Sequence, residues 1–522
     1  MKRRNFLKNT STLSLAAPAL LNGLNILAIP QSRLFELMNL NNDKVLVLIQ
    51  LQGGNDGLNT VIPLDQYDRL SAVRSNILLP ENSLLKIDEK TAFHPAMEGL
   101  KNLYNEGQVN IIHSVGYPNQ NRSHFRSTDI WTAATAADEF DARGWLGKYF
   151  DSQYDNFPTD FPNTETPHPI AITMGPLTSE TCQGISANYS LAISDPFALS
   201  PLAQGQESTP PDTPYGNELA FIREAIAQTN AYTEVISEIA NKGVNMTAYP
   251  SGNRLAEQLK NVALLLAGGI QTKIFVCAIG GFDTHASQVE DASVLNGVHA
   301  NLLTQVSEAV TAFQSDLKQL GLEERVLGMT FSEFGRQIAS NLSLGTDHGT
   351  AAPLLVFGSC VNPGFIGVNP EIPEELAPQE GVAMQIDFRD VYGSVLMDWF
   401  EVPEADVREL IFADFQHLPI IGGCESLSTS TDTEALATQI DISIYPNPFV
   451  HNFQVQFNLP TTHARLSLFD ARGAELKVVF DKQLPAGFHQ FNVETASLPA
   501  GNYYLHLRTG EGQLTRKVVK VR

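Results

Sequence analysis

The chain is poor in cysteine and in positive charge. Its 522 residues include four cysteines, and none of them forms a CxxC pair. This spacing disfavours thiolate metal sites and a disulfide framework, although it leaves one bridge open, and we expect Cys277 and Cys360 to be buried thiols. Lysine and arginine total 34 against 57 aspartates and glutamates, which gives a formal net charge of -23. A surface of this sign repels nucleic acid and anionic lipid, so we expect neither as a partner.

Long apolar runs are missing beyond the N-terminus, where no stretch reaches the roughly 18 apolar residues needed to span a bilayer. The N-terminus itself carries the basic segment KRRNFLK (2–8), followed by the small-residue, weakly apolar stretch STLSLAAPALLNGLNILA (11–28). This layout predicts an export signal over residues 1–28. The twin arginine before Phe6 and Leu7 resembles a twin-arginine (Tat) signal, and an ordinary secretory signal is the alternative.

The long middle of the chain alternates apolar strands with amphipathic helices, which predicts an α/β domain over residues 43–424. Apolar runs bounded by glycine predict buried parallel strands, and apolar residues at helical spacing predict helices. Right-handed crossovers then place helices on both faces of the sheet. The predicted strands are 44–51, 109–115, 273–280 and 325–331, and the predicted helices are 254–269, 294–320 and 391–400.

The composition changes near the C-terminus. Residues 425–440 are rich in serine and threonine and lack a periodic apolar face, which is typical of a linker. Residues 441–522 form short segments with apolar residues at every second position, separated by Gly, Pro, Asn or Asp. This pattern predicts a small antiparallel β-sandwich.

Four motifs in this last region resemble the C-terminal sorting domain of the type IX secretion system of Bacteroidetes: ISIYPNPF (442–449), LSLFDARGAEL (466–476), LPAGNYYLHL (498–507) and TRKVVKV (515–521). The resemblance implies that the secretion machinery is a partner of residues 441–522. It also implies passage across the outer membrane to the cell surface or the medium. A carbohydrate-binding or spacer sandwich is the alternative for a fold that hosts many functions.

Acidic and histidine residues follow three of the predicted strands directly. Asp56 follows the first, Asp283 and His285 follow the second, and Glu333, Asp347 and His348 come after the third. Because ligands bind where the carboxyl ends of such strands converge, we expect these side chains to share one site. Carboxylates and imidazoles suit a divalent metal ion. The alternatives are an Asx turn at Asp56, a loop histidine bonded to an acid at His285, and for Glu333 a supporting role or a pair with Arg336.

Residues 44 to about 400 resemble the DUF1501 family, which is placed in the alkaline phosphatase and sulfatase superfamily. The motifs that carry the resemblance are LIQLQGGNDGLNT (48–60), RSHFRSTDIW (122–131), GWLGKYF (144–150), GGFDTH (280–285), FSEFGRQ (331–337) and DHG (347–349). The superfamily implies a three-layer α/β/α sandwich with two divalent ions about 4 Å apart. By this resemblance Asp56, Asp347 and His348 would hold one ion, with Asn59 nearby. Asp283 and His285 would help to hold the other.

Two features depart from the superfamily pattern. Only Thr284 separates Asp283 from His285, and no clear further histidine follows the Asp347–His348 pair. We expect Asp387 or Asp390 to substitute for that histidine. A carboxylate in place of an imidazole favours harder ions, so Zn, Mg, Mn and Ca, and one ion or two, all stay open.

A hydrolase of this superfamily also needs a nucleophile. We expect it in the loop after strand 109–115, with Ser123 first and Ser127 and Thr128 behind it. His124 would ligate metal or act as acid/base, and Arg122 or Arg126 would clamp an anionic group. Helix capping by Ser123 or Ser127 is the alternative.

These residues together predict an exported, metal-dependent hydrolase of phosphate or sulfate esters whose substrate is an anionic ester. No CxPxR motif is present, which counts against a standard sulfatase. The alternative function is a metal-binding or assembly protein at the cell surface that keeps the fold without catalysis. A polysaccharide-handling protein with a structural metal is a third interpretation.

Overall fold

A computed structural model of the chain separates into two compact units, residues 1–424 and residues 425–522, which are described one at a time. The predicted export signal lies outside the described residues except for two antiparallel dipeptides, β1 (Leu20–Leu21) and β2 (Leu24–Asn25), and the predicted linker lies wholly outside them. The structure describes residues 20–21, 24–25, 43–154, 156–199, 202, 211, 213–422, 442–445, 449–459, 462–470, 475–495, 498–499, 501–509 and 512–520.

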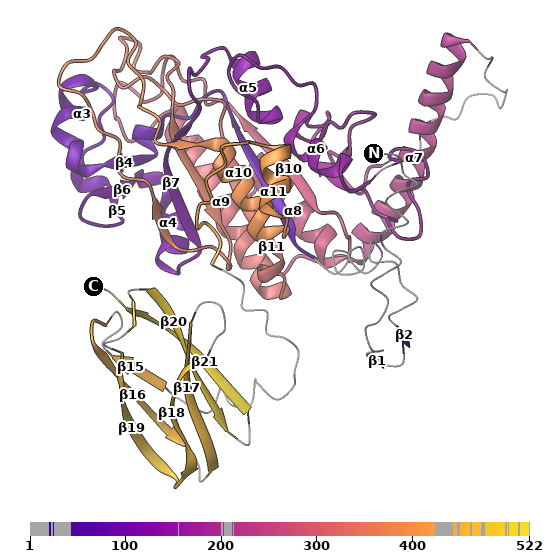
Figure 1. The fold of residues 1–522 in the computed structure, drawn as a ribbon. Helices are drawn as coiled ribbons and strands as arrows, with labels where there is room; N and C mark the ends of the chain where they lie inside the picture. The colour runs from indigo at the N-terminus through magenta and orange to yellow at the C-terminus, as the bar shows by residue number, and fades with distance from the viewer. Residues whose placement is uncertain are drawn as a thin grey trace. The chain divides into compact units, whose positions relative to one another are not determined.

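A nine-stranded sheet forms the centre of the first unit within the described residues (Figure 1). The order is β13-β7-β12-β11-β3-β10-β8-β9, and β14 also pairs with β7. Only β12 runs antiparallel to its neighbours in this part of the chain. The strands are β3 (Val45–Gln52), β7 (Val109–Gly116), β8 (Ala171–Thr173), β9 (Ser190–Ala192), β10 (Ile274–Gly280), β11 (Val326–Phe331), β12 (Ala352–Phe357), β13 (Gly364–Ile366) and β14 (Ile386–Asp387).

Helices cover both faces of this sheet, which confirms the predicted α/β/α sandwich. Val45, Val47 and Ile49 of β3 pack into one core, and the alternate residues Leu46 and Leu48 pack into another. The helices of the first core are α4 (Glu98–Asn105), α7 (Pro214–Lys242), α8 (Arg254–Ala267) and α9 (Val298–Leu320). Those of the second are α5 (His124–Ala133), α6 (Trp145–Asp151), α10 (Phe388–Trp399) and α11 (Glu404–Leu410).

Local sequence signals set the helix ends. The side chain of Asn253 accepts a hydrogen bond from the amide of Ala256 and so caps α8. Helix α9 begins at Val298, four residues later than predicted, and ends at Gly321 with φ +67°. Helix α10 begins at Phe388, three residues earlier than predicted, because the Asp387 side chain accepts from the amide of Arg389.

A small satellite sheet and a short helix complete the described part of the first unit. The sheet consists of β4 (Val61–Pro63), β5 (Leu85–Lys86) and β6 (Thr91–Phe93), and the helix is α3 (Tyr67–Val73). Their apolar side chains, including Ile62, Leu70 and Ala92, form a separate core.

The three predicted strands that precede the acidic and histidine residues are neighbours. Strand β3 pairs in parallel with β10 on one side and with β11 on the other. Gln52 at the end of β3 lies opposite Gly280, and Phe331 at the end of β11 lies opposite Gln50. The loops that follow the three strands therefore leave the sheet at one edge, as the sequence predicts. Strand β7 has the same direction as β11, so α5 begins at this edge too.

The second unit is an antiparallel β-sandwich, as predicted. One sheet has the order β15-β16-β19 and the other β18-β17-β20-β21. Phe453, Val455, Leu466, Leu468 and Leu505 belong to the shared apolar core. The strands are β15 (Ile442–Tyr445), β16 (Asn452–Leu459), β17 (Thr462–Asp470), β18 (Glu475–Leu484), β19 (Gly487–Glu494), β20 (Gly501–Thr509) and β21 (Gly512–Lys520).

The cysteines only partly follow expectation. Cys182 and Cys277 are buried free thiols. Cys360 is disulfide-bonded, so the expectation of a buried thiol there is wrong. Among the described helices, none combines the length and apolarity needed to cross a membrane.

Candidate metal centre

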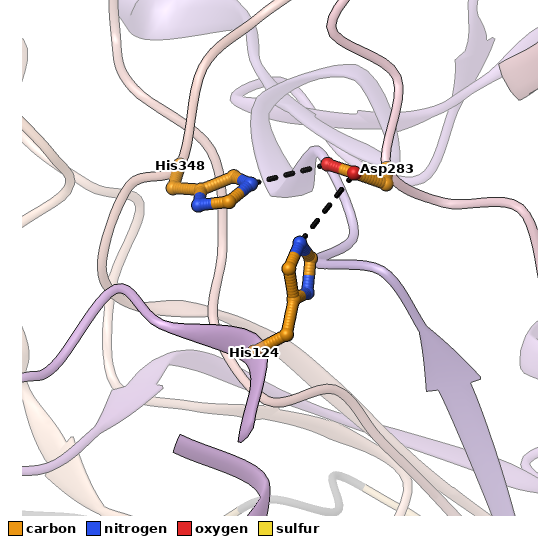
Figure 2. Close-up of side chains that lie close together, drawn as sticks. All are labelled: His124, Asp283 and His348. Atoms are coloured by element: carbon orange, nitrogen blue, oxygen red, sulfur yellow. Dashed lines mark hydrogen bonds and ion pairs between the residues drawn. The ribbon is translucent and has the colours of Figure 1, made fainter. Parts of the chain in front are cut away.

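Three side chains from separate loops converge at the edge of the sheet where β7, β10 and β11 end. His124 is the first residue of α5, Asp283 follows β10, and His348 follows β11. One ligand atom from each lies within 4.8 Å of the others. His124 Nε2 is 3.5 Å from Asp283 Oδ2, and His348 Nε2 is 3.1 Å from Asp283 Oδ1 (Figure 2). The side chains are 25% to 47% exposed, so the cluster is open to solvent.

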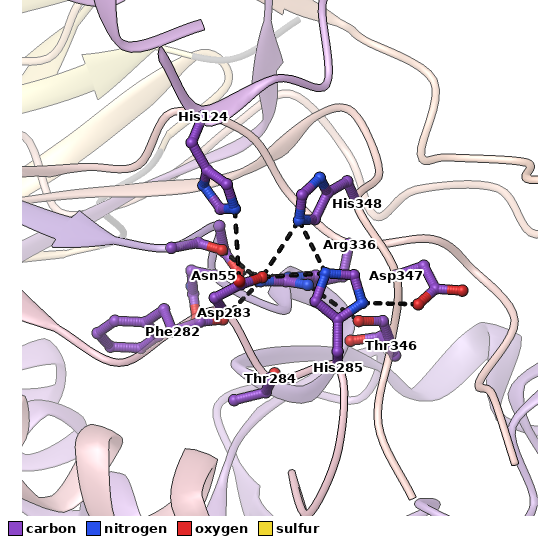
Figure 3. Close-up of polar contacts among 12 residues, drawn as sticks. Asn55, His124, Phe282, Asp283, Thr284, His285, Arg336, Thr346, Asp347 and His348 are labelled. Atoms are coloured by element: carbon purple, nitrogen blue, oxygen red, sulfur yellow. Dashed lines mark hydrogen bonds and ion pairs between the residues drawn. The ribbon is translucent and has the colours of Figure 1, made fainter. Parts of the chain in front are cut away.

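A third imidazole adjoins this group. His285 Nε2 lies 2.9 Å from His348 Nε2 and 3.2 Å from Asp283 Oδ1 (Figure 3). His124, His285 and His348 therefore all turn Nε2 toward the one carboxylate of Asp283. We refer to these four residues as the Asp283 cluster.

The other nitrogen of each ring is also held. Nδ1 of His124 lies 2.8 Å from Glu333 Oε1, and Nδ1 of His285 lies 2.7 Å from Asp347 Oδ1. Nδ1 of His348 lies 2.8 Å from the backbone carbonyl oxygen of Arg122. Carboxylate and carbonyl oxygens accept hydrogen bonds, so each Nδ1 carries the proton and each Nε2 is left to face Asp283. Histidines that bind metal are oriented in this way.

Glycines allow the loops to meet backbone against backbone. Gly53 has φ +122°, and a Cβ built there would lie 2.2 Å from the amide nitrogen of Asp283. The Gly53 amide donates to Glu333 Oε1 over 2.8 Å. A Cβ on Gly345 would lie 2.4 Å from the carbonyl oxygen of Thr284. A side chain at either position would push apart the loops that carry Asp283 and His285.

A buried arginine supports Asp283 from below. Arg336 has a fully buried side chain and donates from Nη2 to Asp283 Oδ1 over 2.7 Å. Its other donors bond the carbonyl oxygens of Gly54 (2.7 Å), Thr346 (2.9 Å) and Phe282 (2.9 Å), and that of Gly53. Arg336 is thus fully engaged and fixes three loops at once.

The charges of the cluster follow from these contacts. Burial alone would raise the pKa of Asp283, but the hydrogen bond and charge of Arg336 together with His348 hold it below its usual value. The hydrogen bond from His285 lowers the pKa of Asp347. Burial lowers the pKa of His348, although its bonds to Arg122 and Asp283 oppose this. Ionised carboxylates therefore stand beside a neutral imidazole at neutral pH.

Asp56 lies near in sequence to the converging loops but contacts none of the cluster side chains among the described residues. It is 1% exposed and accepts from Arg74 Nη1 at 3.0 and 3.1 Å and from Gln288 Nε2 at 2.6 Å. Burial would raise the pKa of Asp56, but the charges of Arg74 and His299 and the Gln288 hydrogen bond lower it. Asn59 is likewise buried and donates to the carbonyl oxygen of Ile77. The cation beside Asp56 is an arginine of this chain.

The remaining acidic candidates also bond elsewhere. Asp387 caps α10 and pairs with Arg389 at 2.8 Å. Asp390 accepts from the amide of Gln416 over 2.8 Å, and burial raises its pKa. Neither acid bonds to a residue of the Asp283 cluster, so the structure does not place them where the missing histidine was expected.

The two candidate anion clamps bond to backbone. Arg122 donates to the carbonyl oxygen of Gln379 over 2.7 Å. Arg126 donates to the carbonyl oxygens of Ala137 (3.1 Å) and Glu139. In these positions both guanidinium groups act as braces for loops.

The serines of this loop have different surroundings. Ser123 is the N-cap residue of α5, but its exposed side chain makes no capping hydrogen bond. Ser127 is buried, and its hydroxyl bonds Tyr117 over 2.9 Å and the carbonyl oxygen of Glu333. Ser127 therefore has a structural role, whereas the hydroxyl of Ser123 is free among the described contacts.

Sequence reasoning missed two neighbours of the cluster. Asn341 donates to Asp347 Oδ1 over 3.2 Å and to the carbonyl oxygen of His285 over 2.8 Å. The ring of Phe334 lies 4.9 Å from that of His124 and 4.7 Å from that of His348, measured between centroids. Phe334 belongs to the motif FSEFGRQ, whose aromatic residue was a usable signal, whereas Asn341 lies in a loop without one.

Two family models match this chain. Residues 246–411 match the family described as "Protein of unknown function (DUF1501)", and residues 443–521 match the "Secretion system C-terminal sorting domain". Both resemblances expected from the sequence are thereby confirmed. The DUF1501 match includes Asp283, His285 and His348, while His124 lies before it. No curated protein matches the chain.

Several solved structures share low similarity with it. A protein in the alkaline phosphatase superfamily from Vibrio parahaemolyticus is 9% identical, with 90% of this chain and 78% of that chain covered and a TM-score of 0.33. A phosphonate monoester hydrolase from Silicibacter pomeroyi is 10% identical, with coverage of 91% and 88% and a TM-score of 0.32. A sulfatase from Pseudoalteromonas sp. is 10% identical, with coverage of 89% and 88% and a TM-score of 0.31. At these values the similarity assigns no activity to this chain.

Proposed function

We propose that this chain, which carries a DUF1501 region and a secretion-system sorting domain, is an exported, metal-dependent hydrolase of phosphate or sulfate esters. One observation carries the proposal. Three histidines point Nε2 at the Asp283 carboxylate while each Nδ1 is held by an acceptor.

The donor set fits a divalent ion. With the Nδ1 protons committed to Glu333, Asp347 and the Arg122 carbonyl, the Nε2 atoms of neutral imidazoles present lone pairs. The Nε2 atoms of His285 and His348 lie 2.9 Å apart, where two lone pairs repel unless a cation lies between them. Three imidazole nitrogens and a carboxylate favour zinc or another late transition metal over magnesium or calcium. We therefore propose zinc as the ion held by His124, Asp283 and His348, with His285 as the fourth contact.

One ion per chain matches the charges better than two. The carboxylate of Asp56, which the superfamily pattern would give to one ion, already pairs with Arg74 in a fully buried contact. Arg336 likewise lies against Asp283 on the side away from solvent. Two arginines of this chain thus supply the positive charge that further metal would bring.

The residues around the cluster divide the work of hydrolysis. A divalent ion supplies a Lewis acid that polarises an ester oxygen. Glu333, Asp347 and the Arg122 carbonyl fix the orientation of the three rings. Ser123, next to His124 and with an uncommitted hydroxyl, is the proposed nucleophile. His124 uses both ring nitrogens in contacts, so we assign it as a ligand and not as an acid/base.

The route out of the cell follows from the two ends of the chain. The C-terminal sorting domain indicates export to the cell surface or the medium, with the secretion machinery as partner. Residues 1–28 would take the chain across the inner membrane first. We propose the twin-arginine route because it carries proteins that have already folded around a metal.

A metal-binding protein without catalysis is the second candidate, and one observation favours it. The guanidinium groups of Arg122, Arg126 and Arg336 are all committed to partners in this chain. An anionic ester would find none of these three free to hold it.

Turnover of generic aryl phosphates and aryl sulfates by the purified full chain separates the two candidates. The hydrolase predicts turnover that a chelator abolishes and added zinc restores. Metal binding without turnover of either ester class, under conditions where the Asp283→Asn variant fails to bind metal, would favour the non-catalytic candidate.

A further inference from the structure

A second cavity, with a volume of about 540 Å3, lies among the segment after α5, the start of α6 and the end of α11. The residues of its wall that matter here are Thr135, Phe140, Asp141, Arg143, Lys148 and Glu409. Cavities of this size are typical of small-molecule sites. None of the residues of the Asp283 cluster belongs to its wall.

Lys148 is the most informative residue of this wall. Its side chain is only 9% exposed, and its ammonium lies 4.0 Å from Asp141 Oδ2, beyond hydrogen-bond distance. The carboxylate of Asp141 is instead held by Arg143, through Nε at 3.1 Å and Nη2 at 2.9 Å. Among the described contacts the Lys148 ammonium thus has no hydrogen-bond acceptor. Burying such a group without one is costly, which indicates that something else meets it.

A second polar group in the same wall also lacks a partner. The hydroxyl oxygen of Thr135 is buried and makes no hydrogen bond to the described residues. Native proteins leave few such groups, and a bound polar ligand or ordered water is a common explanation. Two unmet polar groups around one cavity point to an occupant with oxygen atoms.

The charges of the wall limit what that occupant is. Lys148 and Arg143 are positive, whereas Asp141, Glu139 and Glu409 are negative. A strongly anionic ligand would meet three carboxylates, and a cationic ligand would meet the buried ammonium. A neutral polyhydroxy ligand suits both signs, since each hydroxyl donates to a carboxylate or accepts from an ammonium.

An exposed aromatic ring completes the site. Phe140 lies in the wall and is 77% exposed, which is unusual for a phenylalanine without a partner. A sugar ring presents apolar C–H groups on one face and hydroxyls around its edge. We propose that this cavity binds a neutral saccharide, with the sugar face on Phe140 and its hydroxyls on Lys148 and Asp141.

This site is separate from the Asp283 cluster. Helix α5 begins with His124 in the cluster and ends one residue before the cavity wall starts at Ala134. Ten helical residues at about 1.5 Å each place the two sites roughly 15 Å apart along the helix. The cavity would therefore hold a glycan near the metal centre without contributing to its chemistry.

Calorimetric titration of the purified full chain with neutral oligosaccharides of glucose, galactose, mannose and xylose tests the proposal. A chelator is present throughout, so that the outcome does not depend on the proposed hydrolase. We expect at least one of these sugars to bind. Phe140→Ala is expected to weaken its affinity by about tenfold. Because Phe140 is at the surface, this variant should fold.

Two further variants sharpen the result. Phe197→Ala removes another exposed phenylalanine, 59% exposed and outside the cavity wall, and should leave the affinity unchanged. Lys148→Met should abolish binding, with its unfolding midpoint as the check on folding. The proposal is overturned if no neutral sugar binds, if only sulfated oligosaccharides bind, or if Phe140→Ala and Phe197→Ala behave alike.

Discussion

His285 and His348 face each other through their Nε2 atoms at 2.9 Å, and both nitrogens also face Oδ1 of Asp283. Each ring has its other nitrogen tied to an acceptor, so neither can turn away without losing that bond. Such a pair of imidazoles is stable only around a positive charge. The proposed metal centre follows from this relationship.

The acceptors behind the rings should affect metal affinity. Asp347→Ala removes the partner of His285 Nδ1 and frees that ring to rotate. Loss of such a partner typically costs 10–100-fold in metal affinity. We expect a fall of that order, measured by competition with a chromogenic chelator.

Asp398→Ala is the matched control for this variant. Asp398 also holds a histidine, His417, at 2.8 Å, but neither residue bonds to the Asp283 cluster. Equal losses of metal affinity in the two variants would show that the role assigned to Asp347 is wrong.

The buried pair of Arg74 and Asp56 should contribute to stability. Both side chains are at most 1% exposed, and Arg74 also donates to the carbonyl oxygens of Ile338 and Gln337. Arg74→Leu leaves the carboxylate buried without its cation, which typically costs about 3–5 kcal/mol. We expect this loss in the denaturant unfolding of the first unit.

The exposed pair of Arg69 and Glu374 provides the comparison. Arg69→Leu should change the free energy of unfolding by less than about 1 kcal/mol. Asp56→Asn, in turn, should leave the metal content unchanged. A loss of metal in Asp56→Asn would restore Asp56 as a ligand and contradict the one-ion proposal.

Buried histidines should make the protein less stable in mild acid. Burial lowers the pKa of His113 from its usual 6.5 to about 4, although Asp88 and Asp65 oppose this. Between these two values the unfolded chain takes up a proton that the folded chain does not, so stability falls as the pH falls. The slope for one such group is about 1.4 kcal/mol per pH unit. His94, with a pKa of about 3, and His299, with a pKa of about 4, act in the same direction.

Unfolding midpoints in urea between pH 7 and pH 4 measure this effect. His113→Phe should reduce the slope by the share of one proton, because the variant has no group to titrate there. An unchanged slope in the variant would show that His113 is protonated in the folded chain.

Ser123 should matter for turnover and not for metal. Ser123→Ala removes an exposed hydroxyl that makes no hydrogen bond in the described structure, so folding and metal content should be unaffected. If Ser123 is the nucleophile, kcat should fall at least about 1,000-fold with a generic ester. Turnover close to that of the parent would assign the nucleophile elsewhere.

The sequence predicted the frame of the fold well because hydrophobic spacing decides it. The apolar runs 44–51, 273–280 and 325–331 became the neighbouring parallel strands β11, β3 and β10. Their carboxyl ends then brought Asp283, His285 and His348 together. Helix ends were less predictable, since α10 starts at the cap Asp387 and not at the first residue of its apolar pattern.

The partners of the charged residues could not be predicted in the same way. Arg74 lies outside every motif, yet it occupies the place beside Asp56 that the superfamily pattern gives to an ion. Glu333 carried three possible roles in the sequence, and its contacts with His124 and the Gly53 amide show the supporting one. Contacts between residues 200 or more positions apart leave no local pattern to detect.

Metal content per chain, measured by mass spectrometry on the purified full chain and on Asp283→Asn, tests the central claim most directly. The matched control is His417→Ala, which removes an exposed histidine that does not bond to the cluster. We predict one equivalent of zinc in the parent chain and in the control, and none in Asp283→Asn. A parent chain that holds no metal after incubation with zinc, manganese or magnesium, or an Asp283→Asn variant that keeps its metal, would contradict the account.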